Sequence, residues 1–130
     1  MYNEVLIERN LYPENRGEIP HIMPIKLQNT SCGDELEIYL KIQNNIIIDG
    51  KFSGKGCAIS QASADLFIAI IIGKTVVEAK QMKKDFSAMI LDNSHKNYEH
   101  LGVANALSIV SRMPARAKCA KLPWESLDRF

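Results

Sequence analysis

The chain has 130 residues, of which 46% are hydrophobic and 24% are charged, and its formal net charge is +1. These values are typical of a soluble globular protein, and residues 1–130 are expected to form a single domain. The near-neutral charge gives no indication of nucleic-acid binding. The longest apolar run, Leu66 to Ile72, is far shorter than the roughly 20 residues of a membrane span.

The N-terminal residues lack the basic and apolar regions of a signal peptide, which indicates a cytoplasmic protein. In that reducing compartment, three cysteines (Cys32, Cys57 and Cys119) are not expected to form a disulfide framework. They cannot all pair within one chain in any case. A metal or catalytic site is the better expectation.

The N-terminal third predicts one helix and one strand. Residues 2–10 could form a short helix, which the proline and glycine within 12–17 would end. Residues 22–27 are expected to form an edge strand, because Pro24 lacks an amide proton for a central ladder. Residues 29–34 are rich in Asn, Ser, Gly and Asp, which favour a turn.

A β-hairpin is predicted next. Apolar residues alternate with mainly polar ones from Leu36 to Ile42, and this period of two is typical of a half-buried strand. The pair Asn44-Asn45 favours a turn, and residues 46–52 return as the second strand.

The segment that follows the hairpin predicts a turn and a buried helix. Gly54 and Gly56 allow the backbone to turn sharply just before Cys57. Residues 60–72 are apolar nearly all round, as in a central helix. Cys57 would then lie at or near a helix N-terminus, where the free amides and the helix dipole favour a thiolate. A small buried cysteine at a strand–helix junction is the alternative.

Beyond residue 74 the pattern is helical but interrupted. Thr75-Val76-Val77-Glu78 matches a capping box that opens another helix. From Asp85 to Leu101 the periodicity weakens, which predicts an exposed segment around a small helix at 86–91. Helical periodicity resumes from Gly102 to Met113.

The last predicted helix runs from Ala115 to about Leu127, with Pro114 in its first turn. Pro123 lies inside it and is expected to kink it or break it into two short helices. Trp124 is expected to be a packing anchor. The order of elements predicts an α+β fold with a three-stranded antiparallel sheet packed against helices.

The three cysteines fall near element boundaries and could share one site. Asp34 lies two residues after Cys32 and is a plausible fourth ligand beside Cys57 and Cys119, since Gly33 would let both side chains of the turn point the same way. Three cysteines and an aspartate would suit tetrahedral Zn²⁺. The set would carry a charge of −2 around zinc, which the flanking cations Lys55, Arg116 and Lys118 are placed to offset. Lys55 is equally well explained as a solvated cation.

Three segments around the cysteines carry a further signal: Asn29-x-x-Cys32-Gly33-Asp34, Gly54-x-Gly56-Cys57-Ala58-Ile59-Ser60-x-Ala62-Ser63 and Arg116-x-Lys118-Cys119-Ala120-x-Leu122-x-Trp124. In this order, and over nearly the whole chain, they resemble the three cysteine motifs of the IscU/NifU-N family of iron–sulfur cluster assembly proteins. The resemblance implies a compact IscU/SufU-like α+β domain with the cysteines at one exposed end.

Within that family the chain resembles the SufU branch more than the IscU scaffolds. Scaffolds carry a histidine immediately before the third cysteine, where this chain has Lys118. The weakly patterned residues 85–101 resemble the SufU insertion, and residues 113–118 lack the Leu-Pro-Pro-Val-Lys motif of scaffolds. Two departures from the family are Thr30, in place of a proline, and Pro123, in place of a helix former.

The SufU resemblance implies a zinc-dependent sulfurtransferase that serves iron–sulfur cluster assembly. Its zinc ligands would be Cys32, Asp34, Cys57 and Cys119. Its partners would be a SufS-type cysteine desulfurase and downstream iron–sulfur assembly proteins. Cys32 would accept sulfur from the desulfurase persulfide after a desulfurase side chain replaces it on zinc, with Arg116 beside the site.

Two alternatives use the same ligands. A scaffold protein would hold a [2Fe–2S] cluster on the three cysteines and Asp34. A purely structural zinc would hold the C-terminal helix to the sheet, and chelation would then unfold the domain.

Overall fold

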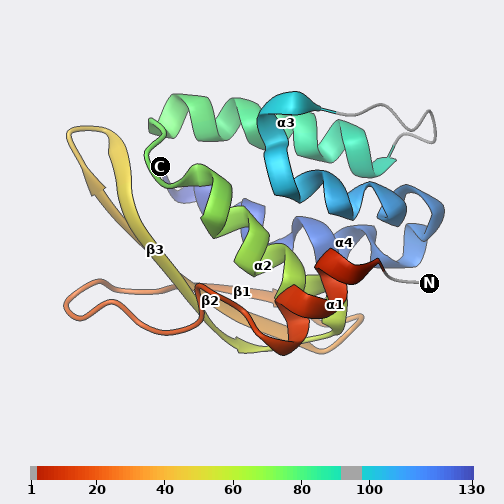
Figure 1. The fold of residues 1–130 in the computed structure, drawn as a ribbon. Coiled ribbons are helices and arrows are strands. Elements are labelled where there is room, and N and C mark those ends of the chain that lie inside the picture. Colours follow the sequence, from red (N-terminus) through yellow and green to blue (C-terminus); the bar gives the residue numbers. More distant parts are fainter. Residues whose placement is uncertain (1–2, 92–97) are drawn as a thin grey trace.

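The computed structural model describes residues 3–91 and 98–130. The fold is α+β, as predicted: one antiparallel sheet has helices packed against it (Figure 1). Its strands are β1 (Ile25–Asn29), β2 (Asp34–Gln43) and β3 (Ile46–Lys55), in the order β1-β2-β3. The described helices are α1 (Glu4–Leu11), α2 (Ala58–Ile71), α3 (Val76–Leu91), α4 (Ala117–Lys121) and the 3₁₀ helices η1 (Glu99–Arg112), η2 (Pro114–Arg116) and η3 (Leu122–Arg129).

The sheet confirms the predicted hairpin and the edge position of its first strand. The β2–β3 turn lies at Asn44 and Asn45, which both have positive φ, as asparagine tolerates. The predicted start of β1 was wrong, because the strand begins after Pro24 and not at residue 22. A proline amide cannot join the ladder, so pairing starts at Ile25, opposite Ile38 of β2.

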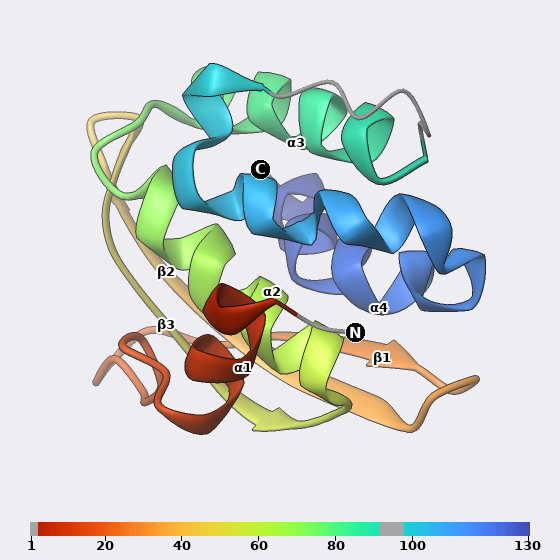
Figure 2. The same cartoon turned by 45° about the vertical axis from the view of Figure 1, so that its right-hand side comes forward.

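Helix α2 is the centre of the molecule, and ten of its residues are buried. It packs against β3 of the sheet and is surrounded by α1, η1, α4 and η3, of which η3 also contacts β1 and β2 directly (Figure 2). The Asp65 side chain is fully buried on α2 and forms an ion pair with Arg9 of α1, at 2.8 Å. This pair holds the N-terminal helix against α2. Ser63 Oγ donates a 2.5 Å hydrogen bond to the carbonyl of Ala120, which fixes α4 against α2.

Helix α3 begins as the capping box predicts but runs further than expected. Thr75 N donates to Glu78 Oε1 (2.9 Å), and Glu78 N donates to Thr75 Oγ1 (3.1 Å). The expected exposed segment with a separate small helix is wrong for residues 85–91, which continue α3 and bury Phe86 and Ile90. The rest of that segment includes residues 92–97, which lie outside the described residues.

The C-terminal region breaks where its proline predicts. Helix α4 ends at Lys121, and η3 begins at Leu122 with Pro123 in its first turn. Trp124 is the expected packing anchor, since it is 1% exposed, stacks on Phe86 and meets Phe67 edge-on, each at 4.7 Å between ring centroids. These rings hold the helix that follows Cys119 against α2 and α3.

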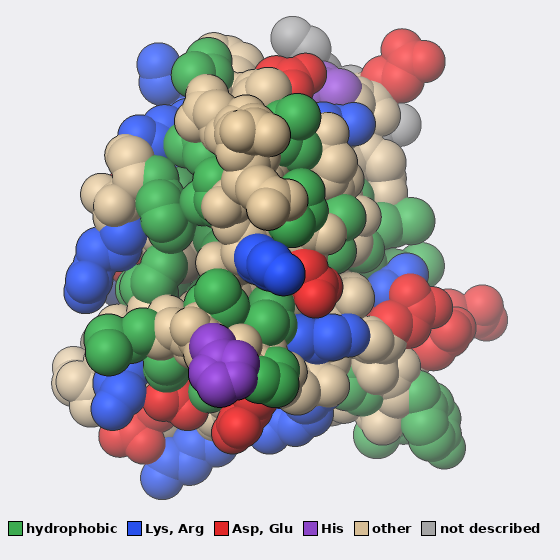
Figure 3. Space-filling view, turned by 90° about the vertical axis from the view of Figure 1, so that its left-hand side faces the viewer, with side chains coloured by type: hydrophobic (Ala, Val, Ile, Leu, Met, Phe, Trp, Pro, Cys, Tyr) green, Lys and Arg blue, Asp and Glu red, His purple; other side chains and the backbone are tan. Residues whose placement is uncertain are grey.

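The hairpin tip lies at the end of β3 away from Cys57. There Ile46 bridges to Thr75, and exposed apolar side chains gather from β3, the end of α2 and α3: Ile46, Ile48, Ile72 and Val77. Figure 3 views the molecule from this side and shows hydrophobic side chains among charged ones. None of the helices in the described ranges has the length and apolar character that crossing a bilayer requires.

Candidate metal centre

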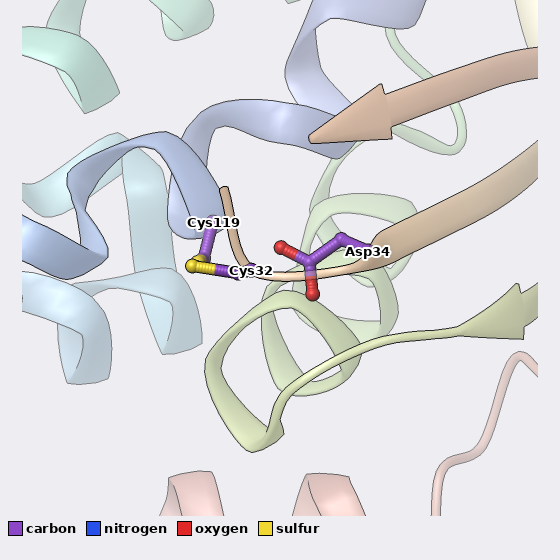
Figure 4. A group of neighbouring side chains, drawn as sticks. All are labelled: Cys32, Asp34 and Cys119. Carbon is purple, nitrogen blue, oxygen red and sulfur yellow. The ribbon is translucent and has the colours of Figure 1, made fainter. Parts of the chain in front are cut away.

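Three of the four predicted ligands meet at the turn between β1 and β2. One ligand atom from each of Cys32, Asp34 and Cys119 lies within 4.8 Å of the others. Figure 4 shows Cys119 reaching from α4 to the sulfur of Cys32, with the Asp34 carboxylate beside them at the start of β2. The two sulfur atoms are 3.1 Å apart. Gly33 has φ +71°, a backbone conformation that lets the turn place Cys32 and Asp34 on the same side.

The Asp34 carboxylate is fully buried and held through both oxygens. Its Oδ1 accepts from the amide of Cys57 (2.9 Å) and from Ser60 Oγ (3.0 Å), and its Oδ2 accepts from Asn29 Nδ2 (3.3 Å). Burial alone would raise the pKa of Asp34, but these hydrogen bonds and one from Cys119 outweigh burial and lower it. The carboxylate is therefore charged and oriented, with Oδ2 on the side of the sulfur atoms.

Gly56 leaves the space that this arrangement needs. A Cβ at this position would lie 2.7 Å from Asp34 Oδ1 and 2.2 Å from Ser60 Oγ, both impossibly close. Gly54, two residues earlier, has φ +105° but still lies within β3, opposite Leu36, so the sharp turn predicted there is not found at Gly54. The two glycines therefore serve different purposes. A Cβ at Gly54 would lie 2.1 Å from the carbonyl oxygen of Glu35, so Gly54 allows β2 and β3 to pair there, and Gly56 lets the start of α2 approach the carboxylate.

Cys57, the fourth predicted ligand, lies at the N-cap of α2, as expected. Its Sγ accepts from the amide of Ser60 at 3.4 Å, and it stands outside the group of three ligand atoms. The Cys57 thiol is one of the groups that raise the pKa of Cys119. All three cysteines are free, and Cys32 and Cys57 are half-buried.

Cys119 is fully buried. Burial raises the pKa of its thiol well above the ordinary value of 9.0, and hydrogen bonding with Cys32, Asp34 and Cys57 adds to the effect. The thiol is therefore protonated, and a cation that binds there must displace a proton.

Of the three cations predicted to offset the charge of the site, Arg116 contacts a proposed ligand, and Lys55 and Lys118 lie elsewhere. Arg116 Nη1 lies 3.6 Å from Cys32 Sγ. Lys55, by contrast, pairs with Glu35 at 3.5 Å, and its side chain is 77% exposed. Lys118 is exposed and lines a shallow pocket of about 210 Å³ beside β1.

Sequence reasoning missed the roles of Asn29 and Ser60 in holding Asp34. The sequence pattern marks Asn29 only as a turn former and motif residue, and Ser60 as a motif residue at the start of a helix. Ser60 lies three residues after Cys57, the spacing of an N-cap and its N3 position, and this spacing was the available signal.

The donor set fits a thiophilic divalent cation. Two thiols and one carboxylate already face one another, and the half-buried Cys57 thiol stands beside them. Cysteine and aspartate are established zinc ligands, and four such donors would complete a tetrahedral set. Arg116 is placed to offset the negative charge that this set would carry.

Comparisons with known proteins point to one family. The family model "NifU-like N terminal domain" matches residues 1–120. The zinc-dependent sulfurtransferase SufU of Bacillus subtilis is 36% identical over 99% of this chain and 88% of its own length. The iron–sulfur cluster assembly scaffold protein IscU of Thermotoga maritima is 35% identical over 98% of this chain and 89% of its own. A crystal structure of SufU from Fervidobacterium islandicum, described as a "Putative iron-sulfur cluster assembly scaffold protein for SUF system", superposes with a TM-score of 0.88 at 37% identity, covering 98% of this chain and 94% of that one.

Proposed function

Because this chain belongs to the NifU-like N-terminal domain family and is an iron–sulfur cluster assembly protein of the IscU/SufU type, we propose that it works as a zinc-dependent sulfurtransferase. The observation that carries the proposal is the convergence of Cys32, Asp34 and Cys119 within 4.8 Å. The likeness to SufU over nearly the whole chain supports zinc as the ion and a cysteine desulfurase as the sulfur donor.

Cys32 is the proposed sulfur acceptor. It lies on a turn and is half-buried, whereas Cys119 is fully buried and Cys57 caps a helix. The Cys32 thiolate would attack the outer sulfur of a persulfide on the partner's cysteine. A new S–S bond forms on Cys32, the partner's S–S bond breaks, and the partner cysteine leaves as a thiolate.

Arg116 has a proposed supporting role in this transfer. Its guanidinium lies 3.6 Å from Cys32 Sγ, and it stays positively charged at any relevant pH. It would offset negative charge on the attacking sulfur and on the persulfide that forms. Downstream iron–sulfur assembly proteins would then receive the sulfur.

Zinc would be held by Cys32, Asp34, Cys57 and Cys119. When bound, it would keep the thiols deprotonated and restrain Cys32 until that residue is released. The chain's own contribution is to hold Asp34 through the start of α2 and to bring Cys119 to the turn on α4.

A scaffold that holds a [2Fe–2S] cluster is the second candidate. Its support is the IscU scaffold of Thermotoga maritima, which is nearly as similar to this chain as SufU is. The same three cysteines and Asp34 could ligate such a cluster.

One experiment separates the candidates. The protein is purified anaerobically, its zinc, iron and sulfide are quantified, and the same sample is added to a SufS-type cysteine desulfurase. Stoichiometric zinc with a marked rise in desulfurase turnover is expected. Stoichiometric iron and sulfide would overturn the transferase in favour of the scaffold, and zinc with no effect on the desulfurase would leave only a structural ion.

A further inference from the structure

The side-chain amide of Asn29 lies between two proposed ligands that come from distant parts of the chain. Its nitrogen donates one hydrogen bond to Asp34 Oδ2 at 3.3 Å and one to Cys119 Sγ at 3.6 Å. An amide nitrogen carries two protons, so each ligand receives one. Asn29 is 8% exposed, and water has little access to compete for these contacts.

The sheet register fixes this placement. Asn29 and Asp34 are direct partners in the β1–β2 ladder, the last pair before the turn. Residues directly opposite each other in an antiparallel pair carry their side chains on the same face. The amide of Cys32 also donates to the carbonyl of Asn29 (3.3 Å), which closes the turn that carries the proposed sulfur acceptor.

We propose that Asn29 is a positioning residue of the metal centre, which aims Asp34 Oδ2 and the Cys119 sulfur at one common ion. This inference rests on the proposed function and deepens it. Each N–H bond directs a lone pair of its acceptor and reduces the negative charge on that donor atom. A centre of three thiolates and one carboxylate around a divalent ion has a net charge of −2. The two N–H groups of Asn29 carry no net charge but stabilise this negative charge by hydrogen bonding, which lowers the cost of burying the centre.

Two substitutions at Asn29 test the role. Asn29→Leu keeps the approximate size and removes both donors. Asn29→Asp keeps the shape but places a second carboxylate against Asp34. Gln28→Leu is the matched control, since Gln28 is the exposed neighbour on β1 and its side chain bonds only weakly to Glu35, at 3.4 Å.

The first measurement is zinc release to a chromophoric chelator from the full-length, zinc-loaded chain. Loss of one outer contact to a metal ligand typically weakens metal binding about 10–100-fold. Both Asn29 variants are expected to show a loss of that size, with Asn29→Asp the more affected, and Gln28→Leu is expected to match the wild type.

The second measurement is the absorption spectrum of the Co²⁺-substituted protein, which reports on the sulfur ligands directly. An N–H···S bond stabilises the sulfur lone pairs, so its loss should move the thiolate-to-cobalt charge-transfer band to longer wavelength in Asn29→Leu. A residue that only stabilises the turn would not move this band. Thermal unfolding of the metal-free proteins checks that each variant is folded.

The outcomes are distinct. A folded Asn29→Leu with wild-type zinc release and an unshifted cobalt band would overturn the role of Asn29 while leaving the metal centre intact. A wild-type chain that binds neither zinc nor cobalt would overturn the centre itself, and the role of Asn29 with it. If Asn29→Leu does not fold, the cobalt band of Asn29→Asp decides in the same way.

Discussion

The sulfur atoms of Cys32 and Cys119 are 3.1 Å apart, although the residues are separated by 87 positions in sequence. One lies on the turn between β1 and β2, and the other lies on α4. Their meeting depends on α2, which contacts the sheet and also holds α4 through Ser63. The candidate centre is therefore a product of the whole fold and not of one local motif.

Replacing Cys32 by serine should abolish sulfur acceptance and leave most zinc binding. The hydroxyl of serine is a poor nucleophile and cannot form a persulfide, while Asp34, Cys57 and Cys119 remain as donors. Stimulation of a cysteine desulfurase should fall to the level without this protein, with zinc quantified on the same sample. Ser31→Ala on the same turn is the control. Full stimulation by the Cys32→Ser variant would refute the acceptor assignment.

Gly56→Ala should disturb the metal centre without changing any donor atom. The new Cβ would meet Asp34 Oδ1 at 2.7 Å and Ser60 Oγ at 2.2 Å, so the carboxylate or the start of α2 must shift. Zinc affinity, measured by chelator competition, should fall about 10–100-fold.

Gly73→Ala is the control for Gly56→Ala. Gly73 has φ +89° with open space around its missing Cβ, so the substitution should cost roughly 1–2 kcal/mol of stability through backbone strain. It should leave zinc affinity unchanged. Equal zinc affinities in the two variants would mean that the close approach at Gly56 does not position Asp34.

Arg116→Ala should slow sulfur transfer without emptying the metal site. The guanidinium faces Cys32 Sγ at 3.6 Å but is not itself a ligand. A hydrogen bond from a charged donor is stronger than one between neutral groups, so we expect the rate of persulfide formation on Cys32 to fall about 10–100-fold, with Arg116→Lys intermediate. Lys55→Ala removes a cation that pairs with Glu35 instead, and should have no effect. A transfer rate equal to wild type in Arg116→Ala would remove Arg116 from the mechanism.

Much of the fold could be predicted from local pattern. The alternation from Leu36 to Ile42 and the Asn44-Asn45 turn indicated the hairpin, and the proline at 123 indicated the break before η3. The extent of α3 could not be predicted in the same way. The polar residues 83–85 interrupt the apolar periodicity, so the buried positions that follow are not recognisable as part of the same helix. Residues 85–91 stay helical because they pack against other helices, and local pattern does not encode that packing.

The candidate site was predictable in its donor residues but not in its supporting contacts. The positions of the three cysteines and of Asp34 suggested the four proposed ligands, and resemblance to a family supported them. The Asn29–Asp34 pair depends on strand register, and the direction of Lys55 depends on Glu35 across the sheet. Both are tertiary relationships that spacing along the chain does not specify.

The capping box of α3 makes a pH-dependent contribution to stability. Hydrogen bonding with the amide of Thr75, and then with its side chain, lowers the pKa of Glu78 below its ordinary value of 4.5. Slight desolvation opposes this shift, and the positive charge of Lys74 adds a little to it. A lowered folded-state pKa means that the contribution is fully present above pH 4.5. It is lost as the pH falls through the folded-state pKa.

Glu78→Gln is the test of this pH dependence. At pH 7 the variant should melt at a lower temperature than the wild type. The difference should shrink as the pH is lowered below 4.5, where wild-type Glu78 also becomes neutral. Thermal melts at a series of pH values measure it, and comparing the two proteins cancels the titration of distant groups. A difference that does not change with pH would contradict the assignment.

Removal of zinc should lower the melting temperature without unfolding the chain. The buried cluster of α2, the sheet and the Phe67–Trp124–Phe86 rings includes Cys119, and Cys32 and Cys57 pack only against its edge, so most of the core does not depend on the proposed ligands. A ligand that binds only the folded state adds RT ln(1 + [L]/Kd), about 2.7 kcal/mol at a free concentration of 100 Kd. Circular dichroism before and after chelation should therefore show unchanged helix content and an earlier melt. Loss of the helical signal at 25 °C would instead support a zinc ion whose main task is to hold the C-terminal helices to the sheet.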